Sequence, residues 1–269
     1  MRRADGRPPW PRSGPDAAPL PGVCQLWWAR PGDVRPEHDA LLGAADLARR
    51  ARLADAADRQ RLTAAAVVAR LVLGAALRTP PAAVRINRTC PTCGSGHGKP
   101  RLADAAALHF SVSHSAHCVV VAVLPGSPVG VDVEAVGRFG PGELEDLAAC
   151  ALADGEREHL ARLPAAERPR AFTVYWTRKE AVLKATGHGL GVPPDELVVT
   201  PPSTPPRVLR RDGPEPVWLR DLPAPAGFVA ALAGLGTAPD DVADRAAGPL
   251  LRQTSRRLSG PTTRSQRYP

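Results

Sequence analysis

Two acidic residues fall on one face of a predicted strand, where they could hold a divalent cation. In residues 128–134, valines alternate with Gly130, Asp132 and Glu134, which is the period of a strand buried on one face. Asp132 and Glu134 would project from the same side, roughly 7 Å apart, and would repel each other unless a cation or a basic side chain lies between them. Carboxylates without a cysteine or histidine cage suit Mg²⁺. The alternative is the polar outer face of an edge strand.

A predicted helix from about residue 165 to residue 186 carries Glu180 and Lys184, which lie four residues apart and share one helix surface. Only three of the 35 basic residues are lysines, at 99, 179 and 184, and two of them fall in this helix. Where basic positions are otherwise arginine, a lysine indicates that a compact ammonium group is needed. Phosphate is one ligand that such a group binds. An ordinary surface ion pair is the alternative.

Two stretches of the first half could contact a phosphate. The glycine-rich loop 89–100 contains Lys99 next to Gly98, and its glycines allow the backbone to approach a ligand closely. Ser113-His114-Ser115 lies at the edge of a predicted pair of strands and could donate hydrogen bonds to a phosphate. A solvated turn is the alternative in both places.

The same loop contains Cys90-Pro-Thr-Cys93 and His97, which resemble half of a zinc knuckle. No second CxxC follows, so four tetrahedral ligands would require Cys118 or another distant group. A loop ordered only by proline and glycine is the alternative. The five cysteines predict no disulfide framework in a chain of this size.

Composition and periodicity predict two folded halves between two disordered tails. The first 20 residues are rich in proline, glycine and arginine, and the last 33 lose periodicity. Two long predicted helices begin with similar patterns at Asp58 and Glu167, and each lies near a β-rich run, which indicates a duplicated α+β unit. The predicted segments are residues 1–20, 21–127, 128–236 and 237–269.

Net charge and hydropathy narrow the function classes. The charge of +8 suggests a nucleic-acid partner, but the two tails supply five of these charges and aromatic residues are few. No run approaches 18 uninterrupted apolar residues, which predicts no membrane span, and the N-terminus lacks the apolar segment of a secretory signal. We therefore expect a cytoplasmic protein without a membrane partner.

Taken in chain order, these motifs resemble those of the Sfp-type 4′-phosphopantetheinyl transferases. The resemblance covers residues 22–235, and its two most specific blocks, GxDxE and WTxKEAxxKA, begin about 45 residues apart. The matching residues are Arg61, Gly98-Lys99-Pro100, Ser111-Val-Ser113-His114-Ser115, Gly130-Val-Asp132-Val-Glu134 and Trp176-Thr-x-Lys179-Glu180-Ala-x-x-Lys184-Ala-x-Gly187-x-Gly-Leu190.

The resemblance implies an activity and a fold. Such enzymes transfer the 4′-phosphopantetheine arm of coenzyme A to a serine of an apo acyl- or peptidyl-carrier protein, depend on Mg²⁺ and release 3′,5′-ADP. The carriers serve fatty-acid, polyketide or nonribosomal-peptide synthesis. The implied fold is α+β, a monomeric pseudo-dimer of two similar halves with the active site in the cleft between them.

The resemblance also implies site residues. The metal ligands would be Asp132, Glu134 and Glu180, and the catalytic residues Glu180 and Lys184, with Glu180 or a water molecule as the base. Coenzyme A would contact Arg61, Lys99, Pro100, Ser113, His114 and Lys184. Two alternatives come from other classes: another Mg²⁺-dependent phosphoryl enzyme such as a nuclease, and a non-catalytic arginine-rich nucleic-acid binder.

Overall fold

The computed structural model describes residues 21–90, 92–187 and 191–259. The predicted N-terminal tail, residues 1–20, lies outside the described residues. The helices are α1 (Ala44–Ala51), α2 (Ala56–Leu77), α3 (Pro141–Ala151), α4 (Asp154–Arg162), α5 (Arg168–Thr186) and α6 (Gly248–Leu258). The strands are β1 (Val23–Ala29), β2 (Ile86–Asn87), β3 (Arg101–Leu102), β4 (Leu108–Ser115), β5 (Cys118–Pro125), β6 (Val129–Ala135), β7 (Val198–Val199), β8 (Val208–Arg210), β9 (Val217–Leu222), β10 (Phe228–Leu235) and β11 (Asp241–Ala246).

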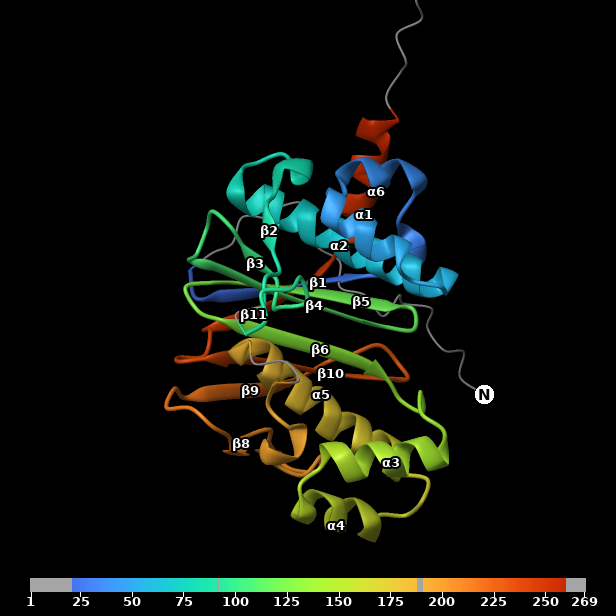
Figure 1. Ribbon diagram of the computed structural model, residues 1–269, viewed down its shortest axis with the longest axis vertical. Coiled ribbons are helices and arrows are strands. Elements are labelled where there is room, and N and C mark those ends of the chain that lie inside the picture. Colours follow the sequence, from blue (N-terminus) through green and yellow to red (C-terminus); the bar gives the residue numbers. More distant parts are fainter. Residues whose placement is uncertain (1–20, 91, 188–190, 260–269) are drawn as a thin grey trace, which may run out of the picture.

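The elements form four layers, helix–sheet–sheet–helix (Figure 1). One sheet has the order β11-β1-β5-β4 and carries α1, α2 and α6 on its outer face. The other has the order β6-β10-β9 and carries α3, α4 and α5. A third apolar core lies between the two sheets. Strand β5 is buried on both faces, which explains its uninterrupted apolar sequence.

The two halves repeat one topology. In the first half the strands around α2 pair in the order β1-β5-β4, and in the second half the strands around α5 pair in the order β6-β10-β9. In chain order each half runs strand, long helix, strand, strand, and its last strand lies in the middle of these three. The predicted α+β class and the duplicated unit are therefore present.

A buried ion pair recurs at matching places in the two halves. Arg70 of α2 binds Asp46, in the first turn of α1, at 2.8 Å and donates to the Pro81 carbonyl. Lys179 of α5 binds Glu156, in the first turn of α4, at 2.5 Å and donates to the Pro194 carbonyl at 2.9 Å. Each cation thus connects a long helix to the helix before it and to the 3-10 turn after it.

The predicted disordered tail 237–269 is wrong for the part that the structure describes. Strand β11 pairs in parallel with β1, and α6 buries Leu251 in the core of the first half. The C-terminal segment therefore completes the first half rather than extending beyond the second. Its sequence signal is weak because β11 is a half-buried edge strand, Asp-Val-Ala-Asp-Arg-Ala, whose partner lies more than 200 residues away. Residues 260–269 lie outside the described residues.

Helix α2 is long and apolar enough to cross a membrane by length and composition, but 67% of the relevant window is buried inside the protein. It begins after Asp55, which accepts a hydrogen bond from the Asp58 N–H, and it ends at Arg78 in the left-handed conformation. Val67, Val68 and neighbouring side chains pack in the core of the first half. This burial accounts for the apolar composition of the helix.

Candidate active site

The two halves meet along a row of serines, which we call the serine ladder: Ser111, Ser113 and Ser115 of β4. Strands β4 and β6 are edge strands of their sheets. The three hydroxyls accept hydrogen bonds from the backbone N–H groups of Val131, Val133 and Ala135 of β6, at 3.1, 3.3 and 3.2 Å. Buried edge N–H groups require partners, and the alternating serines of β4 provide them.

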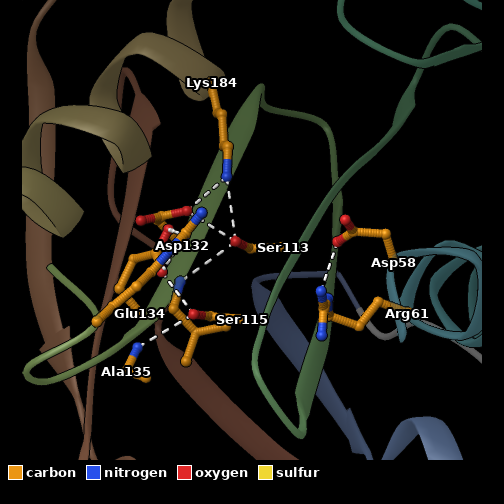
Figure 2. A network of polar contacts seen from close by, with 10 residues as sticks. Asp58, Arg61, Ser113, Ser115, Asp132, Glu134, Ala135 and Lys184 are labelled. Carbon is orange, nitrogen blue, oxygen red and sulfur yellow. Dashed lines mark hydrogen bonds and ion pairs between the residues drawn. The ribbon is translucent and has the colours of Figure 1, made fainter. Parts of the chain in front are cut away.

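Asp132 lies where this ladder meets α5 (Figure 2). Its Oδ1 accepts hydrogen bonds from Ser113 at 2.7 Å and from the Lys184 ammonium at 2.6 Å. The residue is 2% exposed, and its other oxygen, Oδ2, is buried without a hydrogen-bond partner among the residues that the structure describes. An orphaned carboxylate oxygen at such a place requires an explanation, and an oxygen-seeking cation is one.

Glu134 lies two residues further along β6 and is also buried, at 8% exposure. It accepts hydrogen bonds from Ser115 at 2.5 Å and from Arg138, which reaches both carboxylate oxygens. The expectation that β6 buries only one face, and the alternative of a polar outer face, are therefore both wrong. The valines of β6 fill the core between the sheets, and the opposite face is covered by α5.

Gly130 allows α5 to approach β6 closely. A Cβ atom built at Gly130 would lie 2.0 Å from the Ala181 carbonyl oxygen and 2.4 Å from the Ala185 nitrogen. Any side chain there would push the helix away from the strand. The glycine of the GxDxE block therefore sets the distance between the strand that carries Asp132 and the helix that carries Glu180 and Lys184.

Burial and neighbouring charges shift the pKa values of both Glu180 and Lys184. Burial raises the pKa of Glu180, Asp132 and Glu134 raise it further, and Lys184 opposes them. Burial lowers the pKa of Lys184, but the surrounding carboxylates, Asp132 first, outweigh burial and raise it. The three carboxylates thus share two cations, Lys184 and Arg138, an arrangement that favours an additional positive charge.

Basic groups of the first half approach the same place. Lys99 donates to the Ala185 carbonyl at 2.8 Å, at the C-terminal end of α5, where the helix dipole favours a cation. Burial, with a smaller contribution from Arg101, lowers the pKa of Lys99 to about 8. Burial, then Lys184 and then Arg61 lower the pKa of His114.

The structure gathers most of the sequence-predicted site residues at the junction of the halves. Arg61 lies on α2 and pairs with Asp58 at 2.5 Å, on the first-half side of the site (Figure 2). Pro100 follows Lys99 directly and precedes β3. That the junction forms a cleft remains a prediction.

Ser115 and Arg138 were missed by the sequence analysis as partners of Glu134. The alternation Ser-x-Ser-x-Ser in β4 was the available signal for Ser115. The i,i+4 spacing of Glu134 and Arg138 was a weaker one, since it crosses the end of a strand.

Lys179, by contrast, does not lie in this site. Its ammonium is 1% exposed and binds Glu156 together with the carbonyls of Ala151 and Pro194. The expectation that the lysines of this helix mark a phosphate site therefore does not apply to Lys179. The ligands of this ammonium are buried oxygens of the protein.

Comparison with known proteins decides the family. The model of the 4′-phosphopantetheinyl transferase superfamily matches residues 128–233, which include β6, α5 and most of β10. The 4′-phosphopantetheinyl transferase HetI of Nostoc sp. is 32% identical over 235 residues, covering 84% of this chain and 94% of HetI. The chain belongs to the 4′-phosphopantetheinyl transferases.

A second curated relative carries the same name, and one solved structure is similar over part of the chain. The 4′-phosphopantetheinyl transferase Sfp of Bacillus subtilis is 30% identical, covering 48% of this chain and 52% of Sfp. A solved holo-(acyl-carrier-protein) synthase of Bacillus anthracis, in complex with CoA (3′,5′-ADP), is 20% identical with a TM-score of 0.36, covering 41% of this chain and 96% of that chain. The predicted family is confirmed, and the transferase assignment replaces the nuclease and nucleic-acid-binder alternatives.

In this transferase we expect Ser115 to act as a positioning residue for Glu134. Ser115→Ala should lower kcat/KM roughly 10–100-fold, as loss of an outer-shell hydrogen bond does at metal sites, and Ser115→Thr should restore most of it because threonine keeps the hydroxyl. Ser111→Ala is the matched control, since Ser111 accepts from the β6 backbone and its hydroxyl contacts no carboxylate of the described residues. Equal activity losses in Ser111→Ala and Ser115→Ala would show that the ladder is only structural.

Proposed function

We propose that this transferase moves the 4′-phosphopantetheine arm of coenzyme A onto a serine of an apo-carrier protein, with Mg²⁺ as cofactor and 3′,5′-ADP as the released product. The observation that supports this most is the buried carboxylate of Asp132. One of its oxygens accepts from Lys184 and Ser113, and the other has no hydrogen-bond partner in the described part of the chain. We propose Asp132, Glu134 and Glu180 as the Mg²⁺ ligands.

The donor set fits Mg²⁺, which prefers one or two carboxylates together with phosphate and water oxygens. When bound, Mg²⁺ would polarise the pyrophosphate and neutralise developing charge. Lys184 pairs with Asp132 and Arg138 pairs with Glu134. Both basic groups are partly exposed, at 29% and 52% of the side chain, which leaves them room to turn toward a ligand.

Basic groups on both halves are placed to bind the phosphates of coenzyme A. Lys184 lies in the last turn of α5 and Lys99 donates to the Ala185 carbonyl of the same turn. Arg61 and His114 lie on the first-half side, and the pKa of His114 is lowered. Catalysis of phosphoryl transfer consists mostly of positioning and electrostatic stabilisation. We propose that Lys184 stabilises the charge that develops on the transferred phosphate.

The reaction also requires a proton acceptor for the carrier serine. We propose Glu180, because it lies one helical turn before Lys184 on the same surface of α5 and a carboxylate in that position can accept a proton. The serine oxygen forms a bond to the phosphorus on the pantetheine side of the pyrophosphate, and the bond from that phosphorus to the bridging oxygen breaks. The serine proton passes to Glu180, directly or through water, and 3′,5′-ADP leaves.

An intact-mass assay tests this proposal. Purified enzyme, coenzyme A, Mg²⁺ and a panel of apo-carriers from fatty-acid, polyketide and nonribosomal-peptide systems should yield carriers heavier by the phosphopantetheine arm. Omission of coenzyme A or addition of EDTA should abolish the mass gain. The proposed donor, acceptor and metal are wrong if the folded enzyme leaves every carrier of the panel unmodified.

The lowered pKa of Lys99 predicts how coenzyme A binding depends on pH. The ammonium binds phosphate and the free amine does not, so affinity should fall as pH rises through about 8. Stability should change in the opposite direction, because between about pH 8 and 10.5 the unfolded chain binds a proton that the folded chain has released. Isothermal titration with coenzyme A and denaturant unfolding, both between about pH 7 and 10, measure the two trends.

Lys99→Arg is the control for this pH dependence. Because arginine remains charged throughout this range, the fall in affinity near pH 8 should disappear in the variant even if its affinity at neutral pH is lower. A wild-type affinity that stays constant from pH 7 to 10 would contradict the assignment of Lys99 to the phosphates.

A further inference from the structure

The loop that precedes Lys99 brings together three side chains typical of a transition-metal site. The ligand atoms of Cys90, Cys93 and His97 all lie within 4.8 Å of one another, and Cys93 Sγ lies 3.0 Å from His97 Nε2. In a tetrahedral zinc site the bond lengths place ligand atoms roughly 3.5–3.8 Å apart. Small side-chain rotations would therefore bring all three atoms into coordination distance of one ion.

The backbone of the loop is folded so that the two cysteines converge. The Cys90 N–H donates to the Ser95 carbonyl at 2.7 Å, and the Gly94 N–H donates to the Cys90 carbonyl at 2.9 Å. Gly94 has a φ of 74°, in the left-handed region that favours glycine. The turn thus depends on a glycine directly after Cys93.

Little else holds this loop in place. Among the described residues from 89 to 97 no side chain is buried, so the loop has no apolar core of its own. It closes a hairpin of only two residue pairs, Ile86–Leu102 and Asn87–Arg101, and a hairpin of this size is marginal in water. A cross-link within the loop would offset part of the entropy lost on ordering it.

We propose that Cys90, Cys93 and His97 bind a Zn²⁺ ion whose fourth coordination position is open to solvent. Two thiolates and an imidazole select Zn²⁺ over Mg²⁺ or Ca²⁺. Cys118, the distant cysteine that a complete protein ligand set would need, is buried in the core between the sheets and does not join the cluster. Binding releases the thiol protons to solvent and involves no change of oxidation state.

The position of this site gives the ion a structural role. The loop is closed behind the cluster by the hydrogen bond from the Gly98 N–H to the Arg88 carbonyl at 2.7 Å. The next residue, Lys99, contacts the end of α5 in the other half. The ion therefore orders the segment from which the first half reaches the second.

Metal analysis of the full-length, reduced protein tests the proposal. After removal of metal with a chelator, titration with Zn²⁺ against a chromogenic competitor should show about one tight site per chain. Co²⁺ in place of Zn²⁺ should give the thiolate-to-metal charge-transfer absorption that carboxylate sites lack. Hydrogen exchange at the amides of the loop should slow when Zn²⁺ is added.

Matched variants distinguish the cysteine–histidine site from the site formed by Asp132, Glu134 and Glu180. Cys93→Ser and His97→Gln should each weaken Zn²⁺ binding by more than the roughly 10–100-fold that loss of an outer-shell partner costs. Cys150→Ser removes a different exposed thiol, on α3, and should bind as the wild type does; Asp132→Asn should retain the cobalt absorption. The proposal is overturned if reduced wild type shows no charge-transfer band, if Cys93→Ser binds as tightly as wild type, or if Cys90 and Cys93 are found only as a disulfide that no reductant converts to a metal-binding form.

Discussion

Replacing Lys179 with methionine should destabilise the protein by about 3–5 kcal/mol, the cost of breaking a buried ion pair by removing one partner. Lys179 and Glu156 are 1% and 4% exposed and lie 2.5 Å apart. Removing the ammonium leaves the Glu156 carboxylate buried without its counter-charge, although the N–H groups of Ala153 and Val199 still donate to it. The free energy of unfolding from denaturant titration, followed by circular dichroism, measures the loss.

The double variant Lys179→Met/Glu156→Gln keeps this prediction testable even if the single variant does not fold. It removes both charges, so most of the lost stability should return. Arg162→Met is the matched control, because it breaks an exposed pair with Glu158 that contributes about 0–1 kcal/mol. If the free energy of unfolding of Lys179→Met lies within about 1 kcal/mol of the wild-type value, the pair does not stabilise the contact between the helices as we infer.

The contrast between Lys179 and Lys184 shows what the sequence could and could not predict about the site. Both lysines occur in the same helical block, and the scarcity of lysine in the chain predicted a compact ammonium group at both positions. They differ in their surroundings: one faces α4 and the turn at Pro194, and the other faces β6. Helical spacing alone could not predict which face of α5 meets the strand, because the helix is buried along most of its length.

Strand β6 also shows which features could be predicted from the sequence and which could not. The alternation of valines correctly predicted the strand and the shared face of Asp132 and Glu134. It could not predict that this face is buried, because burial depends on Gly130 admitting α5 and on β4 supplying serines from the other half. Local patterns predict elements and faces, whereas contacts between distant segments decide which polar groups become buried partners.

The strand and the helix of the C-terminal segment could not be predicted from the sequence. Strand β11 and helix α6 complete the first half, but each carries charges on its exposed side and neither has a run of apolar residues long enough to stand out. The duplicated topology was easier to detect, because α2 and α5 are long and open with similar residues. The recurring buried ion pair, Arg70–Asp46 in the first half and Lys179–Glu156 in the second, is the strongest structural evidence for the duplication. The sequence alone does not show which charged side chains become buried.

Variants of Asp132 and Lys184 should distinguish an effect on catalysis from an effect on stability. Asp132→Asn and Lys184→Met should each lower kcat/KM by about 10²–10³-fold, the range found when one electrostatic contact to developing charge is lost. Their effects on folding should differ. Lys184→Met leaves the Asp132 carboxylate buried with only Ser113 as its partner and should cost about 3–5 kcal/mol, whereas in Asp132→Asn the partly exposed Lys184 can turn to water and the cost should be small.

A double variant with both substitutions distinguishes a catalytic role of the two residues from a purely structural one. Lys184→Met/Asp132→Asn removes the buried charge and its counter-charge together, so stability should return towards wild type while activity stays low. Mg²⁺ provides a further readout: because a ligand of the folded state raises stability, it should raise the melting temperature of Lys184→Met but not that of either variant that lacks Asp132. Activity that recovers together with stability in the double variant would mean that Asp132 and Lys184 hold the two halves together and take no part in the transfer.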